Sequence, residues 1–228
     1  MGDGRTDRWV EHRAEVRRQL VESAIRAIEQ IGPQVSMREI AAEAKVPKPT
    51  LYRFFTDKSE LAKAIGDQAR DDALQQLMAA QQPSIQTVGD VIHVAVLGHA
   101  TAINGYPNVF RFLMFGLDNG GSNALENSRV VAGTIASLLE TIIEGFGGGK
   151  ADVSFYASTI VGVVAGAANW WINGQEPRES VDAFVGRLEP AVRSIVELAA
   201  TTVGITVDFD APVARLLLHG PSTAPQPS

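Results

Sequence analysis

Most of the chain carries apolar residues at helical spacing, and this periodicity is the strongest constraint on its fold. Residues 6–31 show it first, with charged residues on the other faces. Further segments of this kind cover residues 85–104, 107–117, 123–146, 152–173 and 180–203, and the loops between them are rich in glycine, asparagine and proline. We find no sustained strand alternation and no internal repeat. The sequence therefore predicts an all-α fold of about nine helices.

Three further helical segments follow residue 35. Ser36-Met-Arg-Glu39 has the form of a capping box, in which serine and glutamate satisfy each other's backbone N–H groups. Pro47 ends that helix, and Pro49 suits the first turn of the next, where a missing N–H costs nothing. A second box-like start, Asp57-Lys-Ser-Glu60, opens a helix that runs to about residue 80. This layout is typical of a helix-turn-helix module.

The net charge of −6 is unevenly distributed. Residues 1–63 hold 12 Lys+Arg against 10 Asp+Glu, and the rest of the chain holds 8 against 16. Phosphate attraction needs clustered cations, so an acidic total alone argues against a nucleic-acid partner, but the basic first part favours one.

No cysteine is present, which excludes disulfides, thiolate metal sites and cysteine nucleophiles. The charged start of the chain is no signal peptide, so we expect a cytoplasmic protein. Residues 153–175 carry no charge, but their polar side chains and the absence of basic flanks favour a buried or subunit-contact helix over a membrane span.

The helix that begins at Pro49 has two distinct faces. Leu51 and Phe55 lie four residues apart and suit packing on the module's core. Pro49, Thr50 and Arg53 point the other way, with Tyr52 on the flank. Arginine can read guanine edges in the major groove, threonine a base methyl or a phosphate, and the tyrosine hydroxyl a phosphate. The alternative is a plain surface helix.

Other basic residues could bind phosphates beside this helix. Ser36, Arg38 and Lys58 stand at predicted helix N-termini, which attract anions. Arg5, Arg8, His12, Arg13, Arg17 and Arg18 form a run that could act as an arm along the adjacent backbone or minor groove. Acidic residues are interleaved with this run, so a solvated helix face is an equally good interpretation.

The segment "VSMREIAAEAKVPKPTLYRFFTDKSEL" resembles the DNA-binding part of the TetR family of bacterial transcriptional repressors. It departs from the family where Lys45 replaces a turn glycine and where Pro47 and Pro49 replace small residues. The resemblance implies double-stranded DNA with a palindromic operator as the partner, and the DNA-binding residues are expected to be Ser36, Arg38, Lys45, Lys48, Pro49, Thr50, Tyr52, Arg53, Lys58, Arg5 and Arg8.

The resemblance also implies a domain plan. Residues 1–63 would form the DNA-binding domain with an N-terminal arm at 1–12, and residues 64–205 a larger helical ligand-binding and dimerisation domain. The Pro/Ser-rich end of the chain, "GPSTAPQPS", predicts that residues 206–228 are a mostly disordered tail. "GRTDRW", "YPNVFRF" and the "WW" pair are similar to a subset of the family that regulates alkane and lipid metabolism genes. We therefore expect a repressor released by a small hydrophobic, lipid-like effector.

Apolar residues at helical spacing in the C-terminal part could line the effector cavity, although such stripes are more often ordinary core. His99 and Asn169 could fix a polar group of the ligand, as could His93 and Asn104, unless they are hydrogen-bonded core residues. The expected ligand set is Val96, His99, Ala100, Phe110, Leu113, Met114, Leu117, Leu138, Val163, Ala167, Asn169 and Trp170.

The last two long helices are expected to form a homodimer contact. Gly162, Ala165 and Gly166 would permit close approach of a partner helix. The facing apolar residues would be Val181, Phe184, Leu188, Val192, Ile195, Val196 and Ala199. The alternative is packing within one chain.

Enzyme motifs are absent from the sequence. "EGFGGGKA" lacks the first glycine and the final hydroxyl of a phosphate-binding loop and follows a predicted helix, so it is better explained as a glycine-capped connector. The four histidines have no metal-ligand spacing. We expect no enzymatic activity, cofactor or metal. The rival function is a small-molecule-binding or carrier protein with no role on DNA.

Overall fold

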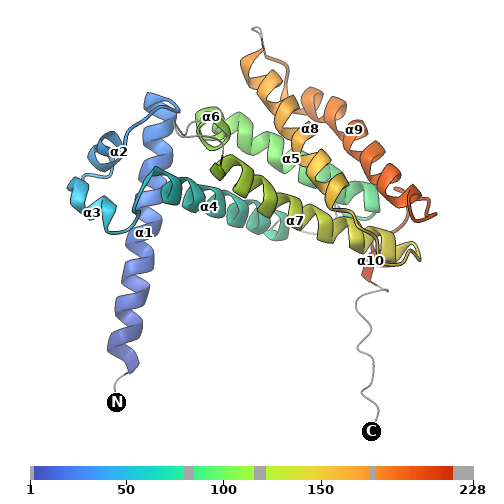
Figure 1. Cartoon of the computed structure of the whole chain (residues 1–228), viewed down its shortest axis with the longest axis horizontal. Coiled ribbons are helices and arrows are strands. Elements are labelled where there is room, and N and C mark those ends of the chain that lie inside the picture. The colour runs from blue at the N-terminus through green and yellow to red at the C-terminus, as the bar shows by residue number, and fades with distance from the viewer. Residues whose placement is uncertain (1–2, 80–84, 116–121, 175–177, 218–228) are drawn as a thin grey trace. The chain divides into compact units, whose positions relative to one another are not determined.

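The computed structural model describes residues 3–79, 85–115, 122–174 and 178–217. Within them the chain forms ten helices, shown in Figure 1. Their bounds are α1 Asp3–Ile31, α2 Met37–Glu43, α3 Lys48–Tyr52, α4 Lys58–Ala79, α5 Val88–Gly105, α6 Pro107–Phe115, α7 Ser122–Gly145, α8 Ser154–Asn173, α9 Val181–Thr201 and α10 Ala214–Leu217. The prediction of an all-α fold is confirmed. The long segments match the predicted ones, and the short α10 was not expected.

The helices fall into two compact units. The first contains Met1–Asp72 together with Gly105–Asn127, so α6 belongs to it although it follows α5 in sequence. Its core includes Leu51, Phe55, Leu61 and Ile65, none of which exposes any surface. Full burial of four large apolar side chains from α3, α4 and the turn between them is what fixes the orientation of the short α3.

α6 is held against α1 by polar bonds as well as by apolar packing. The backbone N–H of Val109 donates to the Glu29 carboxylate at 2.7 Å, and the Asn108 side-chain amide donates to the Glu29 carbonyl at 3.1 Å. Val109 and Phe112 are buried in the same core as α3. The Glu29 carboxylate therefore caps the first turn of α6, where backbone N–H groups lack helical partners.

The second unit contains Ala73–Asn104 and Ser128–Ser228, and α8 packs on α9 within it. The rings of Trp171 and Phe184 stack 4.3 Å apart, and the Trp171 indole N–H donates to the Glu179 carbonyl at 3.0 Å. Within the same chain, α9 buries Phe184, Leu188, Val192, Val196 and Ala199. These five residues were expected to face a partner subunit. That expectation is wrong for them, because helical periodicity identifies an apolar face but not the helix that covers it.

Residues 206–217, assigned to the tail from sequence, pack on the second unit. Val207 and Ala211 are buried. The N–H groups of Val88 and Gly89 at the start of α5 donate to the carbonyls of Ala211 and Phe209, at 3.0 and 2.8 Å. The first turn of a helix has N–H groups without internal partners, and this segment satisfies two of them. Residues 218–228 lie outside the described part of the chain.

α8 is long and apolar enough, by length and composition alone, to cross a membrane. It is the one such helix among the residues described. A core helix of a water-soluble protein passes the same test.

Candidate nucleic-acid interface

α2 begins with the capping box that the sequence predicts. Glu39 N–H donates to the Ser36 hydroxyl at 3.3 Å, and Ser36 N–H donates back to the Glu39 carboxylate at 2.7 Å. The Ser36 hydroxyl also donates to that carboxylate, and this bond and the backbone bond lower the pKa of Glu39. The Ser36 hydroxyl is therefore occupied within the chain, while Arg38 beside it is exposed.

The turn from α2 to α3 closes as a Schellman motif. Val46 N–H donates to the Ala41 carbonyl at 3.0 Å, and Lys45 N–H donates to the Ala42 carbonyl at 3.1 Å. Lys45 has φ +54°, the left-handed conformation that glycine adopts without strain. Lys45 thus adopts the backbone conformation of the glycine that it replaces and bears a steric cost at its Cβ.

α3 displays one face and buries the other. Leu51 and Phe55 expose no surface, whereas Tyr52 is 39% exposed and Arg53 is exposed as well. The predicted burial of Leu51 and Phe55 and the predicted exposure of Arg53 are confirmed.

The N-terminal end of α3 is also open to solvent. Lys48 and Pro49 are exposed and Thr50 is half-buried. The Lys48 ammonium lies 5.3 Å from the centre of the Tyr52 ring, a cation–π contact along the displayed face. A basic, aromatic face of this size can enter the major groove of DNA.

The start of α4 is capped by three side chains. Glu60 N–H donates to the Asp57 carboxylate at 2.8 Å, and the Glu60 carboxylate accepts the Thr56 N–H at 2.8 Å and the Thr56 hydroxyl at 2.9 Å. The two bonds from Thr56 lower the pKa of Glu60. One half of the predicted box is therefore present at Asp57, whereas the glutamate reaches back to Thr56 rather than to the Asp57 N–H.

The predicted contact Lys58 has less open surroundings, and those of Arg5 and Arg8 are not described. The Lys58 ammonium lies 5.2 Å from the centre of the Phe112 ring, and the residue is only half-exposed. Arg5 and Arg8 lie in the first turns of α1, but their side chains are outside the described residues. Sequence reasoning placed Phe54 on the flank of the helix but did not include Phe54 or Trp9 among the DNA-binding residues, and both rings contact the Arg13 guanidinium.

Residues 20–65 match the family model described as "Bacterial regulatory proteins, tetR family". An uncharacterized HTH-type transcriptional regulator of Mycobacterium tuberculosis is 31% identical over 187 residues, which cover 82% of this chain and 79% of that protein. The chain belongs to the TetR family.

Solved structures support the fold of this TetR-family protein. A putative TetR-family regulator from a Rhodococcus species has a TM-score of 0.62 at 18% identity, covering 80% of this chain and 99% of that one. A TetR-family regulator from Streptomyces coelicolor has a TM-score of 0.58 at 20% identity, covering 93% of this chain and 92% of that one. At these identities the likeness concerns the fold alone.

The predicted effector residues of this TetR-family chain are divided between its two units. Phe110, Leu113 and Met114 lie in the first unit, where Phe110 is buried and Leu113 packs on the core of α3. In the second unit Val96 and Ala100 are buried, Val163, Ala167 and Asn169 are half-buried, and His99, Leu138 and Trp170 are exposed. Leu117 lies outside the described residues.

Several predicted polar ligand contacts have partners within the chain. The Asn169 side-chain oxygen accepts a bond from Asn173 at 2.8 Å, and the Asn104 oxygen accepts one from Arg178 at 2.9 Å. His93 Nδ1 lies 2.8 Å from Glu189. His99 is accessible to solvent, yet desolvation by the protein around it lowers its pKa and favours the neutral ring. That the whole predicted ligand set lines one cavity stays a prediction.

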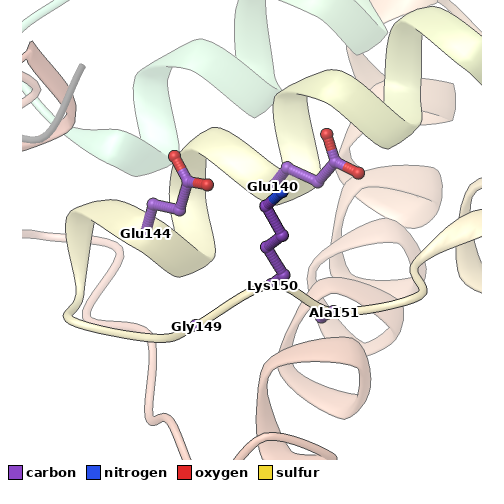
Figure 2. A pocket seen from close by; sticks show the side chains of 5 residues that line it. All are labelled: Glu140, Glu144, Gly149, Lys150 and Ala151. Atoms are coloured by element: carbon purple, nitrogen blue, oxygen red, sulfur yellow. The ribbon is translucent and has the colours of Figure 1, made fainter. Parts of the chain in front are cut away.

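The "EGFGGGKA" loop caps α7. Gly148 N–H donates to the Ile143 carbonyl and Gly147 N–H to the Glu144 carbonyl, both at 2.9 Å, and Gly147 has φ +86°. A pocket of about 290 Å³ beside it is lined by Glu140, Glu144, Gly149, Lys150 and Ala151. Figure 2 shows the Lys150 side chain reaching toward Glu140. These charged walls do not suit an apolar effector.

Proposed function

We propose that this TetR-family regulator is a homodimeric repressor that binds a palindromic operator and is released by a small hydrophobic effector. The observation that carries the DNA-binding half is the exposure of Tyr52 on α3 and of Arg53 at its C-cap, while Leu51 of α3 and Phe55 of the following turn are fully buried. Rigid packing behind a reading face reduces the conformational entropy lost on binding.

The roles of the displayed residues follow from their chemistry. Arg53, Lys48 and Thr50 would contact base edges, and the Tyr52 hydroxyl would donate to a phosphate. Pro49 would pack beside the groove without a backbone donor. The remaining predicted contacts, Ser36, Arg38, Lys45, Lys58, Arg5 and Arg8, would bind phosphates, and Ser36 could do so only by exchanging its bond to Glu39.

A second copy of the chain would dimerise through the exposed faces of α8 and α9. A Cβ added at Gly162, Gly166 or Gly186 would meet no atom within 4 Å, so these glycines border open space. Leu198 and Trp170 are both 56% exposed. Small and apolar residues together permit close helix approach, and a two-fold dimer matches the symmetry of a palindrome.

Effector release would work by population shift. The effector would bind more tightly to a conformation in which the two helix-turn-helix modules are not spaced to fit the operator. Such a ligand lowers DNA affinity by the difference between its binding free energies for the two conformations. Val96 and Ala100 offer apolar surface on the same helix as His99, whose neutral ring could donate or accept one hydrogen bond. The alkane or lipid subset stays a prediction. A protein that binds chromosomal DNA in this way would act in the cytoplasm.

Selection of duplexes from a randomised pool, followed by fluorescence anisotropy across a salt series, tests this function. The account predicts a palindromic consensus, tight specific binding and a steep salt slope. A carrier protein without a role on DNA would enrich no consensus. Native mass spectrometry of protein purified from its source should then detect a retained apolar molecule that, when added back, lowers DNA affinity.

A further inference from the structure

The charged residues in the first half of α1 are segregated by face, although they are interleaved in sequence. Glu11, Glu15, Arg18 and Glu22 succeed one another at intervals of four, three and four residues, so they form one stripe. Glu15 forms an ion pair with Arg18 inside this stripe. The acidic residues that argue for a plain solvated helix therefore gather on one side of α1.

The other side of α1 carries cations and apolar residues. Trp9, Arg13, Arg17 and Leu20 also succeed one another at helical intervals, and Leu20 is buried in the core of the first unit. This stripe, called the basic α1 face below, thus continues the face that packs on the helix-turn-helix module. It contains no carboxylate between Trp9 and Leu20.

Two arginines of the basic α1 face contact the residues that follow α3. The Arg13 guanidinium lies 5.6 Å from the centre of the Phe54 ring and 5.8 Å from that of Trp9. The Arg17 guanidinium lies 5.0 Å from the centre of the Phe55 ring. Both arginines are exposed, so the cations are held on aromatic rings while their N–H donors remain accessible.

These contacts make the displayed surface continuous. Phe54 follows Arg53 directly, so Arg13 connects the end of α3 to Trp9, which is 61% exposed. α1 from Asp3 to His12 extends for about 15 Å, the axial length of about four base pairs.

We propose that the basic α1 face lies along the DNA backbone flanking the bases read by α3, with Arg13 and Arg17 on phosphates and Trp9 against the sugar edge. The inference rests on the proposed function and deepens it, because it chooses one face of α1 and excludes Arg18. Charge complementarity favours DNA over a second copy of the chain, since two such faces would repel each other.

The test compares Arg13→Gln and Arg17→Gln with Arg18→Gln, which removes the same charge from the opposite face of the same helix. Each is titrated with the selected duplex carrying long flanks and with the same duplex trimmed to the bases read by α3. On the long duplex the salt slope should become shallower by about 2 for Arg13→Gln and for Arg17→Gln, about 0.9 for one phosphate contact in each of two protomers. Arg18→Gln should keep the wild-type slope.

On the trimmed duplex all three variants should match the wild type. Trp9→Ala should lower affinity for the long duplex at every salt concentration without changing the slope. Equal slopes for the Arg13, Arg17 and Arg18 variants on the long duplex would overturn the inference, as would loss of the dimer in Trp9→Ala. If the wild type itself enriches no duplex, the proposed function fails instead. Circular dichroism and thermal melting establish that each variant is folded.

Discussion

Ser36 and Glu39 satisfy each other's backbone N–H groups at the entrance to α2, at 2.7 and 3.3 Å. The bonds from Ser36 stabilise the ionised carboxylate and lower the pKa of Glu39 in the folded state. α2 begins the helix-turn-helix module, so the protonation state of the exposed Glu39 carboxylate affects the stability of the whole module.

The lowered pKa predicts a pH dependence of stability. A depressed folded-state pKa means that the stabilisation is present above the unfolded value, about 4.3 for glutamate, and is lost as pH falls through the folded value. The melting temperature of Glu39→Gln should therefore lie below that of the wild type at neutral pH, and the difference should shrink as pH falls below about 4.3. Glu22→Gln, on an exposed residue that caps no helix, is the matched control. A melting-temperature difference between Glu39→Gln and the wild type that stays constant from about pH 7 to about pH 3 would contradict the lowered pKa of Glu39.

Lys45 predicts an unusual response to substitution. Its φ of +54° disfavours any side chain with a Cβ, so Lys45→Gly should raise the free energy of unfolding by about 0.5–1 kcal/mol. Lys45→Val should lower it, because a branched Cβ is tolerated least there. Ala42→Gly, in the last turn of α2, should lower it by about 1 kcal/mol. Urea denaturation measures all three, and a loss of stability in Lys45→Gly like that of Ala42→Gly would show that the turn is unstrained.

The dimer proposal predicts that one exposed leucine matters and another does not. Leu198→Asp on α9 should place two like charges in the proposed subunit interface formed by α8 and α9. It should therefore convert the dimer to a monomer, as measured by sedimentation velocity. Leu138→Asp on α7 makes the same change at a comparably exposed residue, 45% against 56%, and should leave the dimer intact. Dimers that persist in Leu198→Asp at low micromolar concentration would remove α9 from the interface.

The fold could largely be predicted because its elements are signalled locally. The periodicity of α5 to α9 and the prolines and glycines between them determine where the long helices lie. Residues 206–217 could not be predicted in this way. Their order depends on the N–H groups of Val88 and Gly89, more than a hundred residues earlier in the chain, and no local pattern reports such a partner.

The same distinction applies to the candidate site. Leu51 and Phe55 are buried as the sequence predicts, but α3 ends at Tyr52, so the end of this helix did not follow from their spacing. The position of the Lys58 ammonium over the Phe112 ring does not follow from the sequence either, since it depends on α6 returning to the first unit. Likewise, the sequence alone predicts that Phe184 contacts a partner subunit, and only the structure shows that its ring stacks on Trp171 of the same chain.

The most direct test of the account is the affinity of two α3 variants for the selected operator, measured by fluorescence anisotropy. Arg53→Ala should weaken binding by about 10- to 100-fold for each half-site, the loss of one base contact in the range of 1–3 kcal/mol per protomer, and the two losses multiply in the dimer. Tyr52→Phe should weaken binding by about fivefold for each half-site, the loss of one hydrogen bond to a phosphate per protomer. Arg129→Ala on α7 should have no effect, and all three variants should remain dimers. Wild-type affinity in both Arg53→Ala and Tyr52→Phe would contradict the assignment of α3 as the helix that reads DNA.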